Sequence, residues 1–279
     1  MKTPSKRFYL QHLNKFSQYS QSKSWISWYS DVAKHKAIRT VKILKEYKGS
    51  DAKLLDLGCG IGLSFSILAQ EFPNCVGCDS EEKAVIATKV ILKTLNLKVP
   101  VVNYDGERLP FSNNTFDIVT CIEVIEHAKD PDLLLKEIER VLKPDGFLHI
   151  TTANKWWPYE PHFKLLFLSY LPEKLANLYV RLSGKGEGYD GIKLPSYNGF
   201  KKMVDKYFIT KDITLEIIRN YKQYSFDKER GFKVVIVSKL LNFSHQMDSV
   251  SFLEYLPISM DWILLRISLG WLFIAKPKK

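Results

Sequence analysis

The chain is poor in cysteine and lacks several features that mark other classes of protein. Its 279 residues include only four cysteines. Cys75 and Cys78 form a CxxC pair, but no second pair is present to complete a zinc site. The sequence holds no internal repeat and no low-complexity tract. We therefore expect the cysteines to be small buried side chains of a reduced, cytoplasmic globular protein.

Long apolar runs are also scarce. The first residues, MKTPSKRFYLQHLNKF, hold no uninterrupted apolar stretch, so a signal peptide is not expected. Residues 252–275 approach membrane-spanning length, but they contain Glu254, Pro257, Asp261 and Arg266. A charged side chain in the middle of a transmembrane helix costs several kilocalories per mole to place in the bilayer. An amphipathic cover or interfacial segment is therefore favoured over a membrane span. The last residues of this stretch also fit a buried strand.

The net charge of +11 is unevenly distributed along the chain. Residues 1–50 carry +9, residues 51–150 carry −6 and residues 151–279 carry +8. An acidic middle argues against a nucleic-acid module built on that segment and permits a cationic ligand there. The basic flanks favour an anionic partner or surface, although lysine-rich helices that simply face solvent would give the same balance.

The middle of the chain alternates short apolar runs with helical patterns. This alternation is typical of an α/β protein with a mostly parallel, doubly wound sheet. The expected strands are residues 53–57, 75–78, 99–104, 116–122 and 146–153, with helices at 64–72, 81–95 and 132–142. We expect three regions: a helical N-terminal cover (1–48), the α/β core (49–154) and a C-terminal region (155–279) with late strands at 213–218 and 270–275 and an apolar insertion.

A glycine turn follows the first expected strand. Residues 54–62 read LLDLGCGIG, so Gly58, Gly60 and Gly62 have GxGxG spacing rather than the GxGxxG of dinucleotide-binding turns. Asp56 precedes the turn and would repel a phosphate, and no lysine or arginine lies within it. The turn therefore fits a ligand that approaches the backbone closely and carries no phosphate.

A second acid stands where a ribose is commonly bound. Asp79 lies 23 residues after Asp56, at the end of the second expected strand. A carboxylate at this point can accept two hydrogen bonds from a ribose diol. Because both motifs lie at the carboxyl ends of adjacent strands, together they indicate a nucleoside-containing cofactor.

The successive motifs LLDLGCGIG, VGCDS, YDGERLPF, FDIVTCIEVIEHAKDP and LKPDGFLHITTAN resemble those of class I S-adenosylmethionine-dependent methyltransferases. The resemblance is to the broad subgroup that includes ubiquinone-biosynthesis O-methyltransferases, and it covers about residues 50–154. It implies a Rossmann-like, seven-stranded sheet with an antiparallel last strand, for which 270–275 is the candidate. It also implies a methyltransferase that uses S-adenosylmethionine, a sulfonium cation that suits an acidic segment. Between the last two strands we expect a helical insertion.

The resemblance also implies cofactor-binding residues in four groups. Those around the methionine moiety are Asp56, Gly58, Cys59, Gly60 and Gly62. Those at the ribose are Asp79 and Ser80, and those at the adenine edge are Asp105, Gly106 and Glu107. Those that face the methionine and the methyl group are Cys121, Ile122 and Glu123.

The stretch E-x-x-E-H, formed by Glu123, Glu126 and His127, is the candidate catalytic centre. If it is helical, Glu123 and His127 share one face, and His127 could remove the proton of an acceptor hydroxyl. In the ubiquinone-type enzymes the matching motif is associated with a divalent cation, and three such ligands would suit Mg²⁺ or Mn²⁺. A base without a cation is favoured, and His127 could also simply line the pocket. His149, in an expected central strand, is interpreted as a buried structural histidine.

An aromatic segment follows the fifth expected strand. Ligands of doubly wound sheets bind at the carboxyl ends of strands, so this segment could shape the acceptor pocket or pack as a lid. The candidate acceptor residues are Asn154, Trp156, Trp157, Tyr159 and His162. Basic flanks and the apolar stretches at 163–183 and 231–275 favour a small-molecule, lipid-linked or glycan acceptor, with the protein peripheral to a membrane.

Three other functions remain open at this point. An RNA or protein methyltransferase would use the basic flanks, but no recognisable RNA-binding module is present. An NAD-dependent oxidoreductase is disfavoured by the GxGxG spacing and by Asp56. A protein that binds the cofactor without catalysis is the third. The acceptor atom and the oligomeric state are not encoded in any motif.

Overall fold

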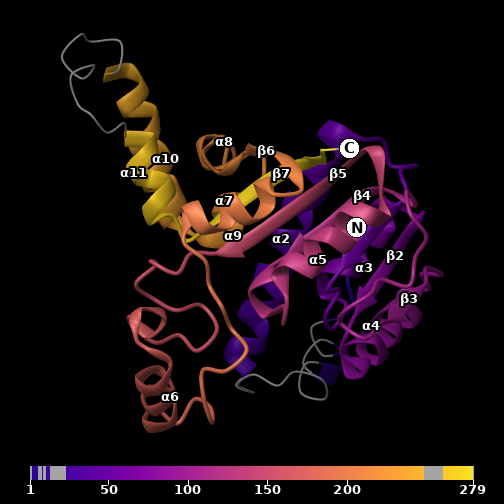
Figure 1. Cartoon of the computed structure of the whole chain (residues 1–279), viewed down its shortest axis with the longest axis horizontal. Helices are drawn as coiled ribbons and strands as arrows, with labels where there is room; N and C mark the ends of the chain where they lie inside the picture. The colour runs from indigo at the N-terminus through magenta and orange to yellow at the C-terminus, as the bar shows by residue number, and fades with distance from the viewer. Residues whose placement is uncertain (1, 6–7, 9–10, 13–22, 248–259, 279) are drawn as a thin grey trace.

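The computed structural model describes residues 2–5, 8, 11–12, 23–247 and 260–278. Its centre is a seven-stranded sheet with the order β3-β2-β1-β4-β5-β7-β6 (Figure 1). Strands β1 to β5 pair in parallel, whereas β7 runs antiparallel to both of its neighbours, as expected. The strands are β1 (Leu54–Leu57), β2 (Cys75–Asp79), β3 (Val101–Asn103), β4 (Phe116–Ile122), β5 (Leu142–Ala153), β6 (Phe208–Asp212) and β7 (Gly270–Pro277).

Helices cover both faces of the sheet, in agreement with the expected doubly wound architecture. One buried cluster joins the sheet to α2 (Lys23–Tyr47), α3 (Leu63–Glu71), α4 (Glu82–Thr94), α8 (Thr214–Arg219), α9 (Phe226–Arg230), α10 (Phe232–Met247) and α11 (Met260–Ile267). The cluster on the opposite face contains α5 (Pro131–Val141) and α7 (Tyr197–Asp205). Strand β7 contributes side chains to both clusters, because Trp271 and Phe273 point to one face of the sheet while Leu272 and Ile274 point to the other.

One expected strand is a helix. Residues 213–218 are expected to form a late strand, but Thr214–Arg219 form α8, and the strand β6 lies just before them. The Asp212 carboxylate accepts a hydrogen bond of 2.8 Å from the Thr214 amide, which starts the helix. Leu215, Ile217 and Ile218 are then buried in the core, so tertiary packing overrides the local preference.

The helices α8 to α11 lie between β6 and β7 in the chain and form the expected insertion between the last two strands. In the part of the chain that the structure describes, no helix is both long and apolar enough to cross a membrane. Of the segment 252–275, residues 252–259 lie outside the described residues. The remainder forms α11 and the β7 strand, whose side chains are mostly buried within the sheet.

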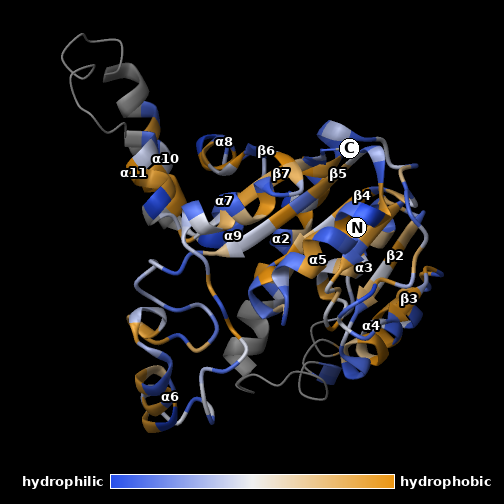
Figure 2. Cartoon of the chain, in the orientation of Figure 1, coloured by the Kyte–Doolittle hydropathy of each residue, from blue (hydrophilic) through white to orange (hydrophobic). Residues whose placement is uncertain are grey.

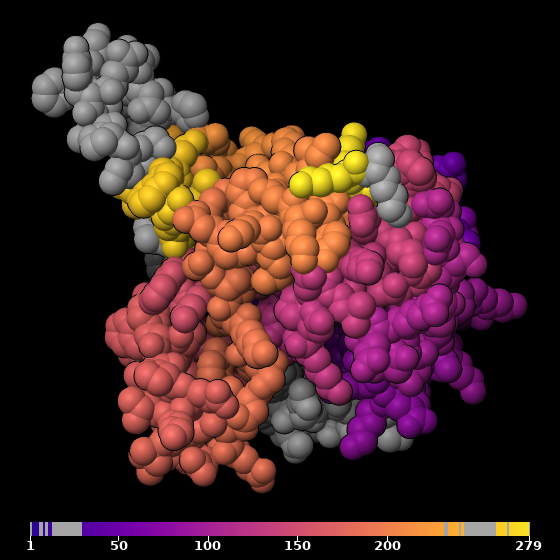
Figure 3. Space-filling view, in the orientation of Figure 1, coloured from indigo at the N-terminus to yellow at the C-terminus, as the bar shows by residue number. Residues whose placement is uncertain are grey.

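A lobe of residues 155–196 follows β5 and stands beside the carboxyl edge of the sheet (Figures 1 and 3). It contains the short 3-10 helix η2 (Leu168–Tyr170) and the helix α6 (Glu173–Leu182). Its own small core consists of Leu165, Leu168, Ala176 and Val180. A hydrogen bond from the Lys155 amide to the Pro195 carbonyl joins the two ends of the lobe, and one from the Lys193 amide to the Glu126 carbonyl ties the lobe to the segment after β4.

The helix α2 is fastened to α9 by a buried ion pair. Arg39 Nη1 and Glu229 Oε2 are 2.5 Å apart, and both side chains are almost fully buried. The Arg39 guanidinium also lies over the Phe226 ring, 4.9 Å from its centroid. Because a buried charge without its partner is strongly destabilising, this contact fixes how α2 lies on the core.

We expect Glu229→Gln to lower the free energy of unfolding by about 3 kcal/mol, because it leaves the Arg39 guanidinium buried without its counter-charge. The double variant R39M/E229M, which removes both charges, should be more stable than the single variant. Urea denaturation measures both. Lys48→Ala is the control, since Lys48 pairs with the exposed Asp145 and its loss should cost under about 1 kcal/mol. A cost that small for Glu229→Gln would contradict the assignment.

Candidate functional site

The glycine turn lies against the end of the neighbouring strand. Strands β1 and β2 are parallel and in register, with Leu57 opposite Cys78. The amides of Gly58 and Cys59 both donate to the Cys78 carbonyl, at 2.8 and 3.1 Å. The Gly60 amide donates to Asp79 Oδ2 at 2.8 Å. The two motifs that the sequence places 23 residues apart are therefore in direct contact.

The three glycines of the turn have positive φ, but their surroundings differ. A Cβ on Gly58 would lie 2.3 Å from Val124 Cγ2, and one on Gly62 would lie 2.8 Å from the Thr88 Cα. Among the described residues, a Cβ on Gly60 would meet no atom within 4 Å. Gly58 and Gly62 are thus required by packing, whereas the backbone at Gly60 faces open space that a ligand could fill.

The Asp79 carboxylate is buried and oriented by backbone amides. Its Oδ1 accepts from the Glu81 amide at 2.9 Å, and its Oδ2 accepts from Gly60. A carboxylate has about four acceptor positions, so two remain for ribose hydroxyl groups. Ser80, the expected second ribose residue, is exposed beside it.

Asp56 and the nearby cysteines are buried beneath the turn. Asp56 Oδ1 accepts a hydrogen bond of 2.6 Å from the Thr120 hydroxyl. Burial raises the pKa of Asp56 to about 7, because desolvation outweighs that hydrogen bond, and the Asp79 charge adds to the shift. Cys59 and Cys121 are buried, as are the two cysteines of the CxxC pair, which confirms the expectation for all four thiols.

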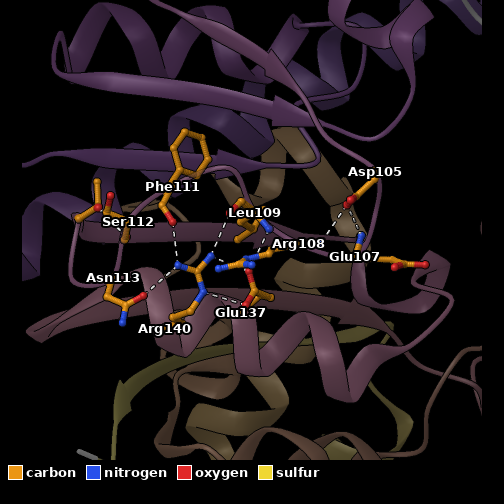
Figure 4. A network of polar contacts seen from close by, with 10 residues as sticks. Asp105, Glu107, Arg108, Leu109, Phe111, Ser112, Asn113, Glu137 and Arg140 are labelled. Carbon is orange, nitrogen blue, oxygen red and sulfur yellow. Dashed lines mark hydrogen bonds and ion pairs between the residues drawn. The ribbon is translucent and has the colours of Figure 1, made fainter.

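The loop expected at the adenine edge is open to solvent, and hydrogen bonds to the Asp105 carboxylate fix its backbone. Asp105, Gly106 and Glu107 are exposed, and Asp105 Oδ1 accepts from the Glu107 and Arg108 amides at 2.8 and 2.9 Å (Figure 4).

Two residues of α5 that the sequence did not single out support this loop. Figure 4 shows Arg140 reaching the carbonyls of Leu109 and Phe111, at 2.9 and 2.7 Å, while its ion-pair partner Glu137 accepts from the Leu109 amide. Their i,i+3 spacing on one helix was the available signal.

The exit of β4 is not the helix that the catalytic hypothesis required. Glu123 has a φ of 55°, and only Ile125–His127 form a short 3-10 helix, η1. The condition under which Glu123 and His127 would share a helical face is therefore not met. Ile122 is half-buried at the end of β4.

Glu123 is held by cations from two distant helices. Its Oε2 lies 2.5 Å from Lys36 Nζ in α2, and its Oε1 lies 3.7 Å from Arg230 in α9. Burial opposes ionisation, but the charges of Lys36 and Arg230 outweigh it and lower the pKa of Glu123 to about 2. Glu123 is thus an ionised member of an ion-pair network.

His162 takes the place that was expected for Glu123 beside the other two motif residues. Ligand-capable atoms of Glu126, His127 and His162 all lie within 4.8 Å of one another. The two imidazole rings meet edge to face, with centroids 5.0 Å apart. The candidate cation ligands are therefore Glu126, His127 and His162, and His162 replaces Glu123 of the expected set.

The members of this cluster titrate differently. Burial and then the Glu123 charge raise the pKa of Glu126 to about 7, and its Oε1 is buried without a hydrogen-bond partner among the described residues. Part of His127 is open to solvent, but desolvation of its ring and the nearby His162 lower its pKa to about 4. His127 is therefore neutral at pH 7 and can accept a proton.

A buried glutamate that the sequence analysis missed orients His162. Glu160 Oε1 lies 2.6 Å from His162 Nδ1, and its Oε2 accepts from the Phe163 amide at 2.6 Å. Burial opposes protonation of His162, but the hydrogen bond and the charge of Glu160 raise its pKa. With Nδ1 held by the carboxylate, Nε2 is directed elsewhere. The Glu-x-His pattern in an aromatic loop was the only signal in the sequence.

Other candidate acceptor residues are not grouped with this cluster. Asn154 is fully buried, and its amide nitrogen donates to the carbonyls of Arg266 and Ser268, at 2.8 and 2.7 Å, which ties β5 to the start of β7. Its interpretation as an acceptor residue is replaced by a structural one. Trp157 is half-buried, whereas Trp156 and Tyr159 are exposed on the lobe.

His149 is fully buried in β5, with its Nδ1 3.2 Å from the Phe273 carbonyl. Desolvation lowers its pKa to about 4, so it is a neutral core histidine, as expected.

Comparison with known proteins gives a consistent result. Residues 55–150 match the family model described as "Methyltransferase domain". The chain is 32% identical over 191 residues to a demethylmenaquinone methyltransferase of Lactobacillus johnsonii, covering 67% of this chain and 70% of the relative. It is 31% identical over 105 residues to a ubiquinone biosynthesis O-methyltransferase of Bartonella tribocorum, covering 38% of this chain and 42% of that relative.

A similar fold occurs in a solved structure. The YcgJ protein from Bacillus subtilis superimposes with a TM-score of 0.52 at 15% identity, covering 88% of this chain and 99% of that one. At this identity the similarity concerns the fold alone, and it agrees with the expected Rossmann-like sheet.

We expect Gly60 and Gly62 to respond differently to alanine. Gly60→Ala should cost only about 1–2 kcal/mol of stability, from its positive φ, but should weaken binding of S-adenosylhomocysteine at least tenfold, because the Cβ enters the open space. Gly62→Ala should mainly destabilise, by about 3 kcal/mol, because its Cβ meets the Thr88 backbone. Calorimetric titration and urea denaturation separate the two effects. Unchanged binding by Gly60→Ala would show that the ligand does not occupy this space.

Proposed function

Because this chain belongs to the class I S-adenosylmethionine-dependent methyltransferases, we propose that it O-methylates a small-molecule, lipid-linked or glycan acceptor near a membrane surface. The observation that carries the catalytic part is the neutral imidazole of His127, which lies at the exit of β4 beside His162 and the buried Glu126.

We place the cofactor along the carboxyl edge of β1, β2 and β4. The ribose hydroxyls would bind Asp79, the adenine would lie at the Asp105–Glu107 loop, and the methionine moiety would cross the open space at Gly60. The cofactor carries a sulfonium charge, and the buried Asp56 has no ion pair among the described residues. A nearby cation would therefore favour its ionised form.

The reaction is an in-line displacement. The acceptor oxygen forms a bond to the methyl carbon while the bond from that carbon to the sulfonium sulfur breaks, and its electron pair stays on sulfur. The hydroxyl proton would pass to a ring nitrogen of His127, whose lowered pKa, about 4, keeps the ring neutral but also makes it a weak base, so positioning must contribute much of the catalysis. The protein's larger contribution is to position the acceptor and exclude water.

In this proposal Glu123 is a structural residue and not a catalytic one. Its carboxylate is ionised and bound by Lys36 and Arg230. It is therefore suited to anchoring the end of β4 under α2 and α9, rather than to transferring a proton.

A divalent cation is the less favoured alternative at the same place. Glu126, His127 and His162 offer one carboxylate and two imidazoles, and Glu160 would orient His162 as carboxylates commonly orient metal-bound histidines. Such a cation would hold the acceptor oxygen and lower its pKa. The buried Glu126 oxygen without a partner fits this alternative.

The acceptor class is inferred from two kinds of support. The relatives are named for demethylmenaquinone methylation and for ubiquinone biosynthesis, which favours a small organic acceptor. Positive charge at both flanks and exposed apolar side chains on the lobe favour an acceptor presented at a membrane. The alternative of an RNA or protein acceptor rests on the basic flanks alone.

If His127 is the general base, His127→Ala should lower kcat by about 10²–10⁴-fold and leave the affinity for S-adenosylhomocysteine within about twofold of wild type. Single-turnover kinetics and calorimetric titration give the two quantities. Glu123→Gln serves as a comparison and should lower kcat less. Unchanged turnover in His127→Ala would exclude it from the reaction.

The acceptor class is tested with S-adenosylmethionine labelled in its methyl group. The protein is incubated with lipid, RNA and protein fractions, and we expect base-stable label to appear in the lipid or small-molecule fraction. His127→Ala is the control for enzymatic transfer. Label that appears mainly in RNA or protein would replace the proposed acceptor with the alternative.

A further inference from the structure

The lobe of residues 155–196 exposes a group of large apolar side chains. On α6 and just before it, Leu171, Leu175, Leu178 and Leu182 are between 36% and 79% exposed. Single exposed leucines are ordinary, but a continuous set is not. Figure 2 shows apolar residues along α6, which lies at the outer end of the lobe, away from the sheet.

The helix α6 is apolar on two separate faces. Ala176 and Val180 are buried and pack on Leu165 and Leu168 within the lobe. At 100° per residue, the three exposed leucines within the helix, Leu175, Leu178 and Leu182, fall within an arc of about 60°, centred roughly two-fifths of a turn away from the buried face. Core packing therefore accounts for one face of α6 and leaves the leucine face without a partner among the described residues.

Charges are arranged asymmetrically around this leucine face. Lys174 and Arg181 are exposed, and the helical period places both on the flank next to the leucines. Glu173, the only acid of the helix, lies on the opposite side of the axis. Lys185, just past the end of the helix, is also exposed. The apolar face is thus bordered by cations, which suits an anionic surface.

Aromatic residues of the same lobe form a second exposed group. Phe167 and Trp156 both stack edge to face on Tyr170, and all three are at least 39% exposed. The Lys155 ammonium lies 5.3 Å from the centroid of the Trp156 ring. Tryptophan, tyrosine and lysine with apolar bodies and polar tips are characteristic of the headgroup region of membranes.

We propose that the α6 face, defined as Leu171, Leu175, Leu178 and Leu182 with Lys174 and Arg181, docks on an anionic phospholipid bilayer. The leucines enter the headgroup and acyl boundary, while the two cations contact lipid phosphates. Docking of a second copy on this face is disfavoured, because it would bring the same cations of two molecules together. The inference extends the membrane part of the proposed function by assigning the surface that makes the contact.

This docking also has a consequence for the site. The lobe begins where β5 ends and carries His162, which belongs to the cluster with Glu126 and His127. A bilayer bound to α6 would therefore contact the same lobe that carries His162.

The test is co-sedimentation of the full chain with vesicles of about 30% phosphatidylglycerol in phosphatidylcholine. The variant L175Q/L178Q/L182Q should reduce partitioning at least tenfold, as estimated from the apolar area it withdraws. The control I86Q/L133Q/I209Q changes three exposed apolar residues elsewhere and should partition like wild type. Thermal denaturation and binding of S-adenosylhomocysteine should be unchanged in both variants.

The charge contribution is tested separately. K174Q/R181Q should lower partitioning about thirtyfold on the anionic vesicles, at about 1 kcal/mol per cation, and should have little effect on pure phosphatidylcholine. High salt should reduce wild-type binding in the same way.

Three outcomes would overturn the inference. They are wild-type protein that stays in the supernatant, equal binding of wild type and L175Q/L178Q/L182Q, and a wild-type dimer, measured by light scattering, that the same variant abolishes. The vesicle assay needs neither cofactor nor acceptor, so docking can fail while methyl transfer is intact. Conversely, label that appears only in RNA would refute the proposed acceptor and leave the vesicle result unaffected.

Discussion

The hydrogen bond from the Gly60 amide to the Asp79 carboxylate is the contact on which the site depends. It joins the turn after β1 to the end of β2, and it is possible only because those strands are parallel and in register. The positive φ of Gly60 turns its amide toward the acid. In return, the acid is held in one orientation, with acceptor positions left for a ligand. The same hydrogen bond therefore joins two elements of the fold and orients a side chain of the candidate binding site.

The strands of the core were predictable because each is buried on both faces. Parallel strands under two layers of helices read as largely apolar runs, and β1, β2, β4 and the part of β5 from Gly146 onward are buried almost throughout. The same reasoning failed at residues 213–218, where an apolar, β-branched run is a helix. Composition alone does not separate a buried strand from a short buried helix. Here the burial of Leu215, Ile217 and Ile218 in the core favours the helix, and the Asp212 carboxylate accepts a hydrogen bond at its start.

The chemical site was predictable only where it is local in sequence. The glycine turn and Asp79 are near one another in the chain, and their spacing placed them at the ends of adjacent strands, where the structure brings them into contact. Glu123 is different, because its partner Lys36 is 87 residues away and no motif connects them. Asn154 is tied to backbone more than 110 residues downstream. His162 reaches His127 through a lobe whose folding back on the sheet has no signature in the sequence.

The electrostatics of the site support a cationic cofactor independently of any motif. A buried carboxyl normally has a basic partner, as Glu123 has in Lys36 and Glu229 has in Arg39. Asp56 has only the Thr120 hydroxyl among the described residues, so burial holds its pKa near 7. Bringing a sulfonium cation near this carboxyl would supply the missing partner and favour its ionised form. With the cofactor bound, Asp56 would be a buried acid whose charge is stabilised by the ligand rather than by the fold.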